Sequence, residues 1–389
     1  MTRVTVREYA ASLRPRYQAA SRKVKKRILD EFCETTRMHR KSAIRLLKEA
    51  PGLKAVGHGR PRRYGPEVAE PLAKVWEVGD RMCGKLLAPV LPDLVTALER
   101  HGEIALQPEV RQRLLEASPS TIDRLLRRYK TRGLRQPRLN RLRSSGLKAE
   151  VPLRTWSEWK DVPVGSVQAD LVLHCGDSTE GFYLTTLCAI DVATGWTELQ
   201  PVWGMSQENV VAAIHLASRR LPFRLQALHT DNGGEFLNHK LVGWCRRERV
   251  SLTRGRSYRK NDQAYVEQRN WQTVRRQVGY DRLSSKEALT LLEHLYGCLR
   301  LQLNFYRPVR KLIGKERHGA RVRKRYDEPR TPYQRLLAAG GLTEDQQTKL
   351  AAVHDRTNPA ELTRRIQALQ RRLWHLGQEE RRLSEPSVG

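Results

Sequence analysis

The chain has 389 residues, which is enough for two or three domains that each bury a hydrophobic core. Its 72 Lys and Arg residues outnumber 42 Asp and Glu residues, so its formal net charge is +30. Such self-repulsion adds no stability to a fold, and the excess therefore favours a polyanionic partner, nucleic acid first. No apolar run is long enough to span a membrane, and the polar start lacks the apolar core of a signal peptide. We therefore expect a cytoplasmic protein with no membrane partner.

Six cysteines are scattered along the chain without a CxxC pair. This spacing indicates neither a zinc knuckle nor a disulfide framework. We expect reduced and mostly buried thiols.

Two apolar stripes at helical spacing predict a pair of short helices between residues 21 and 51. The segment between them, residues 33–39, is short enough to turn one helix sharply onto the next. We predict a helix-turn-helix DNA-binding domain over residues 1–56, whose second helix enters a major groove. An ordinary helical hairpin with a solvated basic face is the alternative. The predicted DNA contacts are Arg37, His39, Arg40, Lys41 and Arg45.

A basic segment broken by Gly and Pro follows at residues 57–65 and contains Arg60, Arg62 and Arg63. Such a segment favours neither a helix nor a central strand. Extended arginine peptides fit the narrow minor groove of DNA, so we predict a DNA-tracking arm here. A flexible, solvated linker is the alternative.

A second helix-turn-helix domain is predicted over residues 66–134, with helices near 108–117 and 119–130. Ser118 as N-cap and Pro119 at the first helical position predict the start of the second helix. A basic linker without periodicity, residues 135–155, then leads to the next domain. The predicted DNA contacts of this second unit are Ser120, Thr121, Arg124, Arg127 and Arg128.

Residues 156–300 shift in composition toward β-formers and form the predicted central domain. Three apolar or alternating runs, 166–175, 182–191 and 196–203, are typical of an antiparallel meander. They are followed by a helix (207–219), a strand (225–228), a helix (235–248), a strand (250–254) and a long helix (262–279). This order predicts a mixed five-stranded α/β sheet with flanking helices.

Three acidic residues in this domain predict a metal site. Asp170 lies inside the first strand, where a buried carboxylate is costly without a cationic partner. Asp231 follows the fourth strand, before two glycines that allow a tight turn. Glu267 lies on the long helix, with 35 residues between it and Asp231. Each acid alone fits an ordinary turn or surface position, but together they form an oxygen-only cluster suited to Mg²⁺ or Mn²⁺.

Four segments of this domain closely resemble the core of DDE transposases and retroviral integrases, above all bacterial insertion-sequence transposases. The resemblance covers roughly residues 160–300. The segments are VQAD (167–170), DVATGW (191–196), HTDNGGEF (229–236) and KNDQAYVEQRN (260–270).

The resemblance implies an RNase H-like catalytic core with Asp170, Asp231 and Glu267 as metal ligands and catalytic residues. It implies two metal ions per active site. Asn232, Glu235, Asn261 and Asn270 match motif positions that support or orient the ligands, and Lys260 is a candidate DNA contact. Asp191 matches a motif acid too, but we expect it to cap the Thr194–Gly195 turn. The zinc-binding His-His-Cys-Cys set of retroviral integrases is absent from the sequence.

Residues 301–389 are predicted to form a basic, mostly helical tail. Residues 311–326 are basic and are predicted to be irregular and to contact DNA phosphates. A short helix is expected from Thr331 to Ala339, and another from 358 to 383. This last helix would pack on the core or pair with another subunit, or else have a solvated basic face.

The sequence as a whole predicts a bacterial, nucleoid-associated DNA transposase. It would bind the terminal repeats of its mobile element, cleave DNA and join the 3′-OH end to target DNA. Its partners would be double-stranded DNA and further copies of itself, because two ends must be held together in a synaptic complex. Two alternatives remain open: a sequence-specific DNA-binding regulator with a repurposed core, and an RNase H-like nuclease that cleaves without joining.

Overall fold

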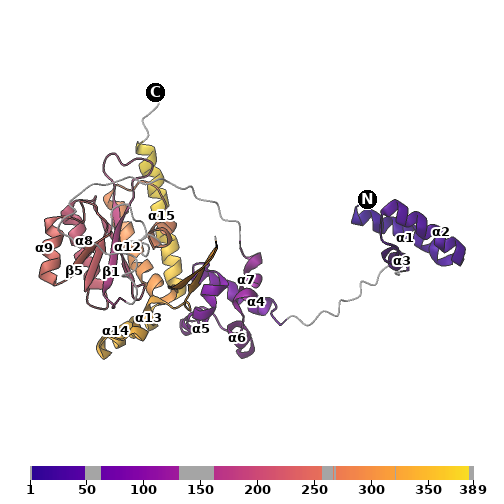
Figure 1. Cartoon of the computed structure of the whole chain (residues 1–389), viewed down its shortest axis with the longest axis horizontal. Helices are drawn as coiled ribbons and strands as arrows, with labels where there is room; N and C mark the ends of the chain where they lie inside the picture. The colour runs from indigo at the N-terminus through magenta and orange to yellow at the C-terminus, as the bar shows by residue number, and fades with distance from the viewer. Residues whose placement is uncertain are drawn as a thin grey trace, which may run out of the picture. The chain divides into compact units, whose positions relative to one another are not determined.

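A computed structural model describes residues 2–48, 63–130, 162–255, 266, 269–319 and 321–384 (Figure 1). Contacts divide the chain into two units, Met1–Arg63 and Tyr64–Gly389. Several predicted site residues lie outside the described residues: Arg60, Arg62, Lys260, Asn261 and Glu267. No helix among the described residues is both long and apolar enough to cross a membrane.

The first unit consists of three helices, α1 (Arg3–Ala19), α2 (Arg22–Thr36) and α3 (Arg40–Lys48). The two helices predicted here are α2 and α3, whereas α1 was not predicted. Arg37 ends α2 in the left-handed conformation, with a φ of 53°, and α3 begins three residues later. The apolar faces of all three helices meet in one small core, which includes Ala10, Phe32 and Leu47.

The second unit begins with four helices, α4 (Pro66–Val78), α5 (Gly84–Arg100), α6 (Pro108–Leu115) and α7 (Pro119–Leu125), followed by the short 3₁₀ helix η1 (Leu126–Arg128). α7 begins where the sequence predicts, because the Ser118 hydroxyl accepts the Thr121 N–H. At Gly84 the start of α5 lies directly against α7. An added Cβ there would lie 2.2 Å from the Pro119 carbonyl oxygen, so only glycine allows this approach.

A mixed five-stranded sheet forms the centre of the second unit, as predicted. Its strands are β1 (Ser166–Leu173), β2 (Thr185–Asp191), β3 (Thr197–Val202), β4 (Ala227–Thr230) and β5 (Ser251–Arg254). The order is β3-β2-β1-β4-β5. The first three strands pair antiparallel, whereas β4 runs parallel to both β1 and β5. This order and these directions are those of an RNase H-like core.

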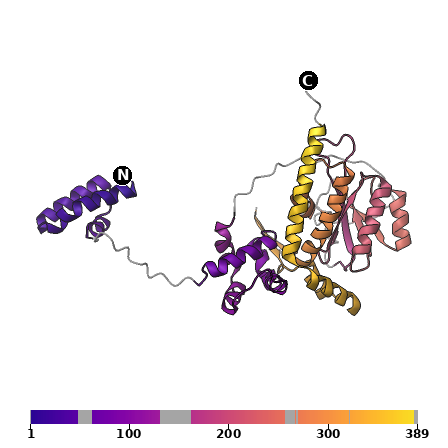
Figure 2. The same cartoon turned by 180° about the vertical axis from the view of Figure 1, so that it is seen from behind.

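Helices cover both faces of the sheet (Figures 1 and 2). On one face, α8 (Gln207–Arg220) and α9 (His239–Glu248) pack on alternate strand residues such as Val167 and Leu187. On the other face, α12 (Lys286–Leu301) and α15 (Pro359–Ser384) pack on Val172 and Leu199. Because side chains alternate along a strand, Asp170 belongs to the same face as Val172. α9 begins four residues later than predicted, because the Asn238 side chain caps it.

The basic segment after the core is a β-ribbon, so the prediction of an irregular segment is wrong. β6 (Leu312–His318) pairs antiparallel with β7 (Arg321–Tyr326). Gly319, with a φ of 59°, lies in the turn between them, where the left-handed conformation costs glycine little. Two helices follow, α13 (Pro332–Ala339), which begins with a Thr331 and Gln334 capping box, and α14 (Glu344–Arg356), which was not predicted.

The helices α4 to α7 share one hydrophobic core with residues far along the chain. Leu91, Leu98 and Ile122 belong to the same buried cluster as Trp196 and Phe305. Polar contacts also join this region to the C-terminal helices α14 and α15: the Arg364 guanidinium pairs with Glu103 at 2.7 Å, and Arg100 pairs with Asp355 at 2.7 Å. The described parts of the predicted segments 66–134 and 156–300 are therefore packed together in one unit.

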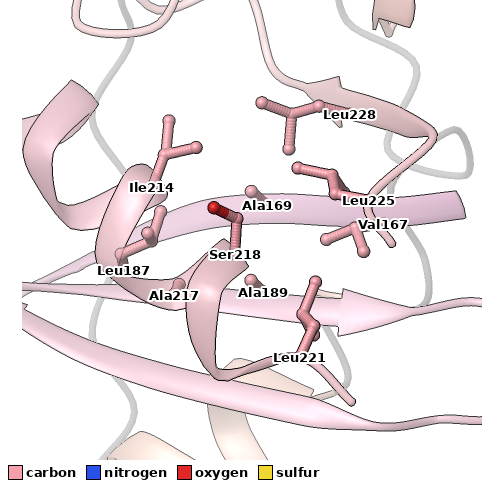
Figure 3. A pocket seen from close by; sticks show the side chains of 10 residues that line it. All are labelled: Val167, Ala169, Leu187, Ala189, Ile214, Ala217, Ser218, Leu221, Leu225 and Leu228. Atoms are coloured by element: carbon pink, nitrogen blue, oxygen red, sulfur yellow. The ribbon is translucent and has the colours of Figure 1, made fainter. Parts of the chain in front are cut away.

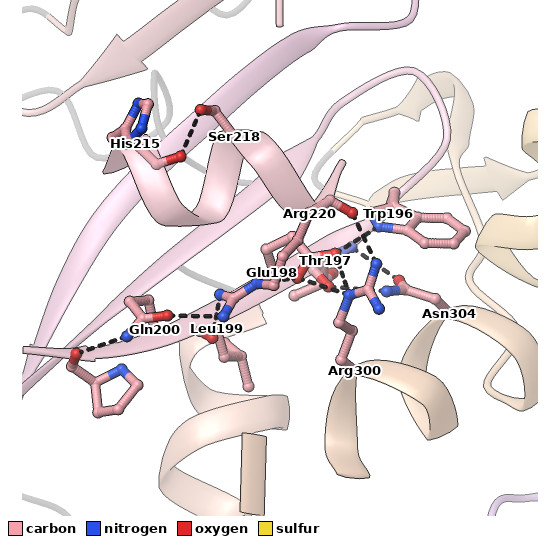
Figure 4. A network of polar contacts seen from close by, with 11 residues as sticks. Trp196, Thr197, Glu198, Leu199, Gln200, His215, Ser218, Arg220, Arg300 and Asn304 are labelled. Atoms are coloured by element: carbon pink, nitrogen blue, oxygen red, sulfur yellow. Dashed lines mark hydrogen bonds and ion pairs between the residues drawn. The ribbon is translucent and has the colours of Figure 1, made fainter. Parts of the chain in front are cut away.

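A buried ion network fixes the edge of the sheet to two helices (Figure 4). Glu198 on β3 is fully buried and accepts hydrogen bonds from Arg300 Nε at 2.7 Å and from Trp196 Nε1 at 2.9 Å. Arg220 Nε lies 3.2 Å from the same carboxylate. Burial raises the pKa of Glu198, and the two guanidinium groups oppose that shift. The network ties β3 to the end of α8 and to α12.

Replacing Glu198 by Ala should destabilise the second unit by about 3 kcal/mol, because two guanidinium groups and an indole N–H lose their acceptor. Urea unfolding of the full chain measures this change. Asp345→Ala serves as a control, since it removes an exposed ion pair with Lys349 on α14 and should cost less than about 1 kcal/mol. Equal stability of wild type and Glu198→Ala would contradict the assignment.

Candidate active site

Two of the three predicted acids are brought together by the parallel pairing of β1 and β4. The register sets Ser166 opposite Ala227 and Gln168 opposite His229. Carried two residues further, the same register places Asp170, inside β1, beside Asp231, the first residue after β4. The carboxylates therefore lie at one edge, although 60 residues separate them in the sequence.

Asp170 is held by the helical segment that follows the predicted third acid. One of its oxygens, Oδ2, accepts a hydrogen bond from Asn270 Nδ2 at 2.7 Å, and Oδ1 accepts the Leu171 N–H at 2.9 Å. Asn270 begins the π-helix η4 (Asn270–Arg275), which continues into α11 (Arg276–Val278). Asn270 was predicted as a supporting residue, and the structure places it against one of the acids.

Gln168 provides a second connection between β1 and the segment before η4. Its side chain is fully buried, and its Oε1 accepts the main-chain N–H of Val266 at 3.3 Å. Val266 precedes Glu267 in the sequence, and Glu267 itself lies outside the described residues. Gln168 was not among the predicted site residues. Its position could have indicated a role at the site, because Gln168 precedes Asp170 by two residues and therefore lies on the same side of the strand.

Asp231 lies in the turn after β4, and Gly233 shapes this turn. The Gly233 N–H donates to Asp231 Oδ1 at 2.9 Å. A Cβ added to Gly233 would lie 2.4 Å from the Glu235 carboxylate, whereas one on Gly234 would meet open space. Gly233 therefore donates its N–H to the Asp231 carboxylate, and its lack of a side chain leaves room for the Glu235 carboxylate. Of the two glycines, Gly233 is the more constrained.

Burial raises the pKa of Asp231, and the Gly233 N–H only partly opposes that shift. Burial and the nearby charge of Asp231 raise the pKa of Glu235 as well. The two carboxylates are thus close enough to repel each other. Among the described residues no Lys or Arg forms an ion pair with Asp231.

Asn232 and Asp191 have supporting positions. Asn232 Nδ2 donates to the Gly255 carbonyl at 2.8 Å, and its Oδ1 accepts from Arg254 at 3.0 Å. Asn232 thus joins the ends of β4 and β5. Asp191 is fully buried and accepts from the Thr194 hydroxyl at 2.7 Å, so it caps the predicted turn.

The donor set fits a hard divalent cation. Carboxylate oxygens are the ligands that Mg²⁺ and Mn²⁺ prefer, and the half-buried Asp231, which has no ion pair with a Lys or Arg among the described residues, favours such an ion. Within the described residues, no three His, Cys, Asp or Glu side chains are grouped to hold a metal. Asp170 and Asp231 are thus two candidate ligands, and Glu267 stays a predicted third.

An apolar gap lies between the sheet and α8 (Figure 3), and none of the acids lines it. Its lining includes Val167, Leu187, Ile214 and Leu228, and Ser218 is its one hydroxyl residue. This lining has no group that would bind a charged substrate or a metal. The gap belongs to the hydrophobic core.

The described candidates for DNA contact are mostly at the surface. The five residues of the first unit, Arg37, His39, Arg40, Lys41 and Arg45, are all exposed on α3 or the turn before it. Arg40 also pairs with Asp30. In the second unit Thr121 is half-buried, and Arg128 lies over the Tyr129 ring with its guanidinium carbon 4.9 Å from the ring centroid. The other described candidates, Arg63, Ser120, Arg124 and Arg127, are exposed.

The strand order and directions define a protein with an integrase-type, RNase H-like core. No family model matches the chain. The chain is 43% identical over 334 residues to the uncharacterized protein y4rM of Sinorhizobium fredii, covering 86% of this chain and 94% of that protein. It therefore belongs to the same family as y4rM.

Two solved structures are similar to part of the chain. One is the catalytic core domain of BIV integrase, with 19% identity, 48% of this chain and 99% of that chain covered, and a TM-score of 0.28. The other is the HTLV-2 integrase catalytic core domain in complex with magnesium, with 14% identity, 39% and 93% covered, and a TM-score of 0.30. The fold assignment rests on the strand order and directions given above.

Mn²⁺ should raise the thermal unfolding midpoint of the wild-type chain but not that of Asp231→Asn. At 100 times its Kd, a ligand of the folded state adds about 2.7 kcal/mol of stability. In EDTA the variant should be as stable as wild type or more so, because the amide removes a half-buried charge and still accepts the Gly233 N–H. Asp177→Asn, at an exposed acid, is the matched control and should keep the Mn²⁺ response. An equal response of wild type and Asp231→Asn would rule out this metal site.

Proposed function

We propose that this protein is a DNA transposase that binds the terminal inverted repeats of its mobile element, cleaves DNA and joins the 3′-OH end to target DNA. The observation that supports the proposal is the parallel register of β1 and β4, which sets Asp170 beside the position of Asp231 just after β4, with Asn270 hydrogen-bonded to Asp170. That arrangement presents two carboxylates at one sheet edge, which is the geometry that phosphoryl transfer on DNA requires.

Asp170, Asp231 and Glu267 would hold Mg²⁺ or Mn²⁺, two ions per active site. When bound, such ions activate an attacking oxygen and stabilise the leaving oxygen at a phosphodiester. Asn270 orients the Asp170 carboxylate, and the Gly233 N–H orients that of Asp231. Glu235 and Asn232 support the turn and the neighbouring strand ends. The magnesium named for the HTLV-2 integrase core is consistent with this ion choice.

Double-stranded DNA would contact three basic surfaces, each described by itself. α3 offers the exposed Lys41 and Arg45, and α7 with η1 offers Arg124 and Arg127. The β6–β7 ribbon is the third surface. A two-stranded ribbon fits the major groove of B-DNA, and exposed cations on both of its strands favour phosphate contacts. Because two DNA ends must be held together, the active form would be a dimer or a higher oligomer.

An RNase H-like nuclease would cleave the same DNA without joining it, so cleavage and joining must be measured separately. The substrate is a linear duplex with the sequence that borders the gene of this chain. Asp231→Asn should abolish both Mg²⁺-dependent activities and leave DNA binding near wild type. Asn270→Ala should lower both rates about 10- to 100-fold, because it loosens a metal ligand without removing it.

Asp177→Asn is the control for these variants and should retain both activities. Wild-type cleavage without joining would support the nuclease. Binding of the duplex with neither activity would support a DNA-binding regulator. Undiminished joining by Asp231→Asn would overturn the catalytic assignment.

Arg45→Ala on α3 should weaken DNA binding and lower the slope of log affinity against log salt by about 0.9, if Arg45 contacts one phosphate. Gel retardation of the border duplex at several salt concentrations measures both quantities. Arg365→Ala, at an exposed arginine on α15, is the matched control and should leave the slope unchanged. If Arg45→Ala has the same salt slope as wild type, α3 is not part of the DNA interface.

A further inference from the structure

Two large aromatic side chains lie exposed and in contact at one edge of the sheet. Phe182 is 43% exposed and Trp203 is 37% exposed, and their ring centroids lie 4.5 Å apart at an interplanar angle of 43°. Met205, two residues beyond Trp203, is 40% exposed, and its sulfur lies 3.6 Å from the Tyr183 hydroxyl. Adjacent exposed apolar side chains of this size indicate an interaction site.

The main chain around the ring pair is firmly held. The Arg282 guanidinium donates to four carbonyls of the β1–β2 connection, including Phe182 at 3.1 Å and Cys175 at 3.1 Å. The carbonyl of Trp203 accepts from Asn209 Nδ2 at 2.7 Å. A ligand would therefore meet a surface that is already ordered, which lowers the entropic cost of binding.

Gly204 allows the close packing of the rings. Its φ is 69°, and a Cβ added there would lie 3.2 Å from Phe182 Cε2. Its carbonyl also accepts the Thr185 hydroxyl at 2.7 Å. A side chain at this position would strain the backbone and push against the Phe182 ring. Gly204, which lies between Trp203 and Met205 in the sequence, is thus suited to keep the rings of Phe182 and Trp203 in place.

The ring pair lies at the same sheet edge as the candidate active site. Thr185 pairs with Val202 on β3 and with Leu173 on β1, so Phe182 and Trp203 leave the sheet where β1 ends. Gln207 Nε2, just after Met205, donates to the Gly234 carbonyl at 3.4 Å, in the turn that follows Asp231. The charge of Glu235 also contributes to the raised pKa of Tyr183, after the larger effect of burial.

We infer that Phe182, Trp203 and Met205 form a stacking platform for an unpaired base of the DNA strand at the active site. This inference rests on the proposed function and specifies how that site holds its substrate. Aromatic rings stack on any base, and an unpaired base has a face free to do so. Phosphate is a poor occupant, because exposed acids flank the rings in the sequence: Asp177 lies in the β1–β2 connection, and Glu208 lies in the first turn of α8. The platform therefore distinguishes distorted or frayed DNA from intact duplex.

The test uses the full chain in Ca²⁺, which avoids dependence on cleavage, and a 2-aminopurine reporter. One duplex carries this base in an unpaired three-nucleotide fork, and a second carries it fully paired. Wild type should bind the forked duplex more tightly and quench its fluorescence by stacking. Trp203→Ala should bind the fork about tenfold more weakly and lose the quenching, with unchanged affinity for the paired duplex. Trp203→Phe, which keeps a ring, should restore both.

Trp374→Ala is the matched control, because Trp374 is 56% exposed on α15 and should affect neither duplex. Phe182→Ala provides a second variant of the platform, and thermal unfolding verifies that each variant folds. Equal fork binding and quenching by wild type and both platform variants would overturn the inference. A loss of self-association in Trp203→Ala, with fork binding intact, would instead show that a second copy covers the rings.

This result is separable from the proposed function. If wild type cleaves and joins DNA but shows no platform-dependent quenching, the inference fails and the transposase proposal stands. If the quenching depends on Trp203 but no cleavage occurs in Mg²⁺, the base-binding inference stands and the enzyme proposal fails.

Discussion

The pairing register of β1 with β4 is the constraint on which the candidate site depends. A shift of one residue would move Asp170 to the opposite face of the sheet, away from Asn270. Packing fixes the register, because Val167 and Ala169 on one face and Val172 on the other must enter different hydrophobic clusters. The same alternation that builds the core therefore also sets the direction of the carboxylate.

A second constraint is the negative charge of Asp231 and Glu235, which lie close together after the end of β4. Asp231 and Glu235 repel each other, and burial adds to the cost of their ionised forms. Elsewhere the fold pairs a buried acid with cations: Glu198 lies against Arg220 and Arg300. The contrast is informative, because Asp231 lacks such a partner among the described residues. An acid that the protein leaves without a cation is suited to binding one from solution.

Much of the site could be predicted from the sequence because it depends on local patterns. The alternation around Asp170 gave the first strand, and Asp231 with its glycines marked a strand end and a turn. The cap of Asp191 on Thr194 also followed from residue types only three positions apart. Asn270 could be predicted as supporting, but its hydrogen bond to Asp170 depends on how a helix packs across the sheet.

The parts that could not be predicted depend on contacts between distant segments. The helices α4 to α7 share a core with Phe305, and no periodicity in the sequence shows which apolar stripes meet. The β6–β7 ribbon was missed because its charge hides the alternation on which strand prediction relies. The ring pair of Phe182 and Trp203 forms because two connections meet beyond the ends of β2 and β3.

The central claim is that Asp170 and Asp231 hold a divalent cation beside the end of β4. Anomalous X-ray scattering from crystals of the full chain grown with Mn²⁺ tests it most directly. The account predicts a Mn²⁺ peak within about 2.5 Å of carboxylate oxygens of both residues, and its loss in Asp231→Asn. Mn²⁺ bound only elsewhere on the chain at saturating concentration would contradict it.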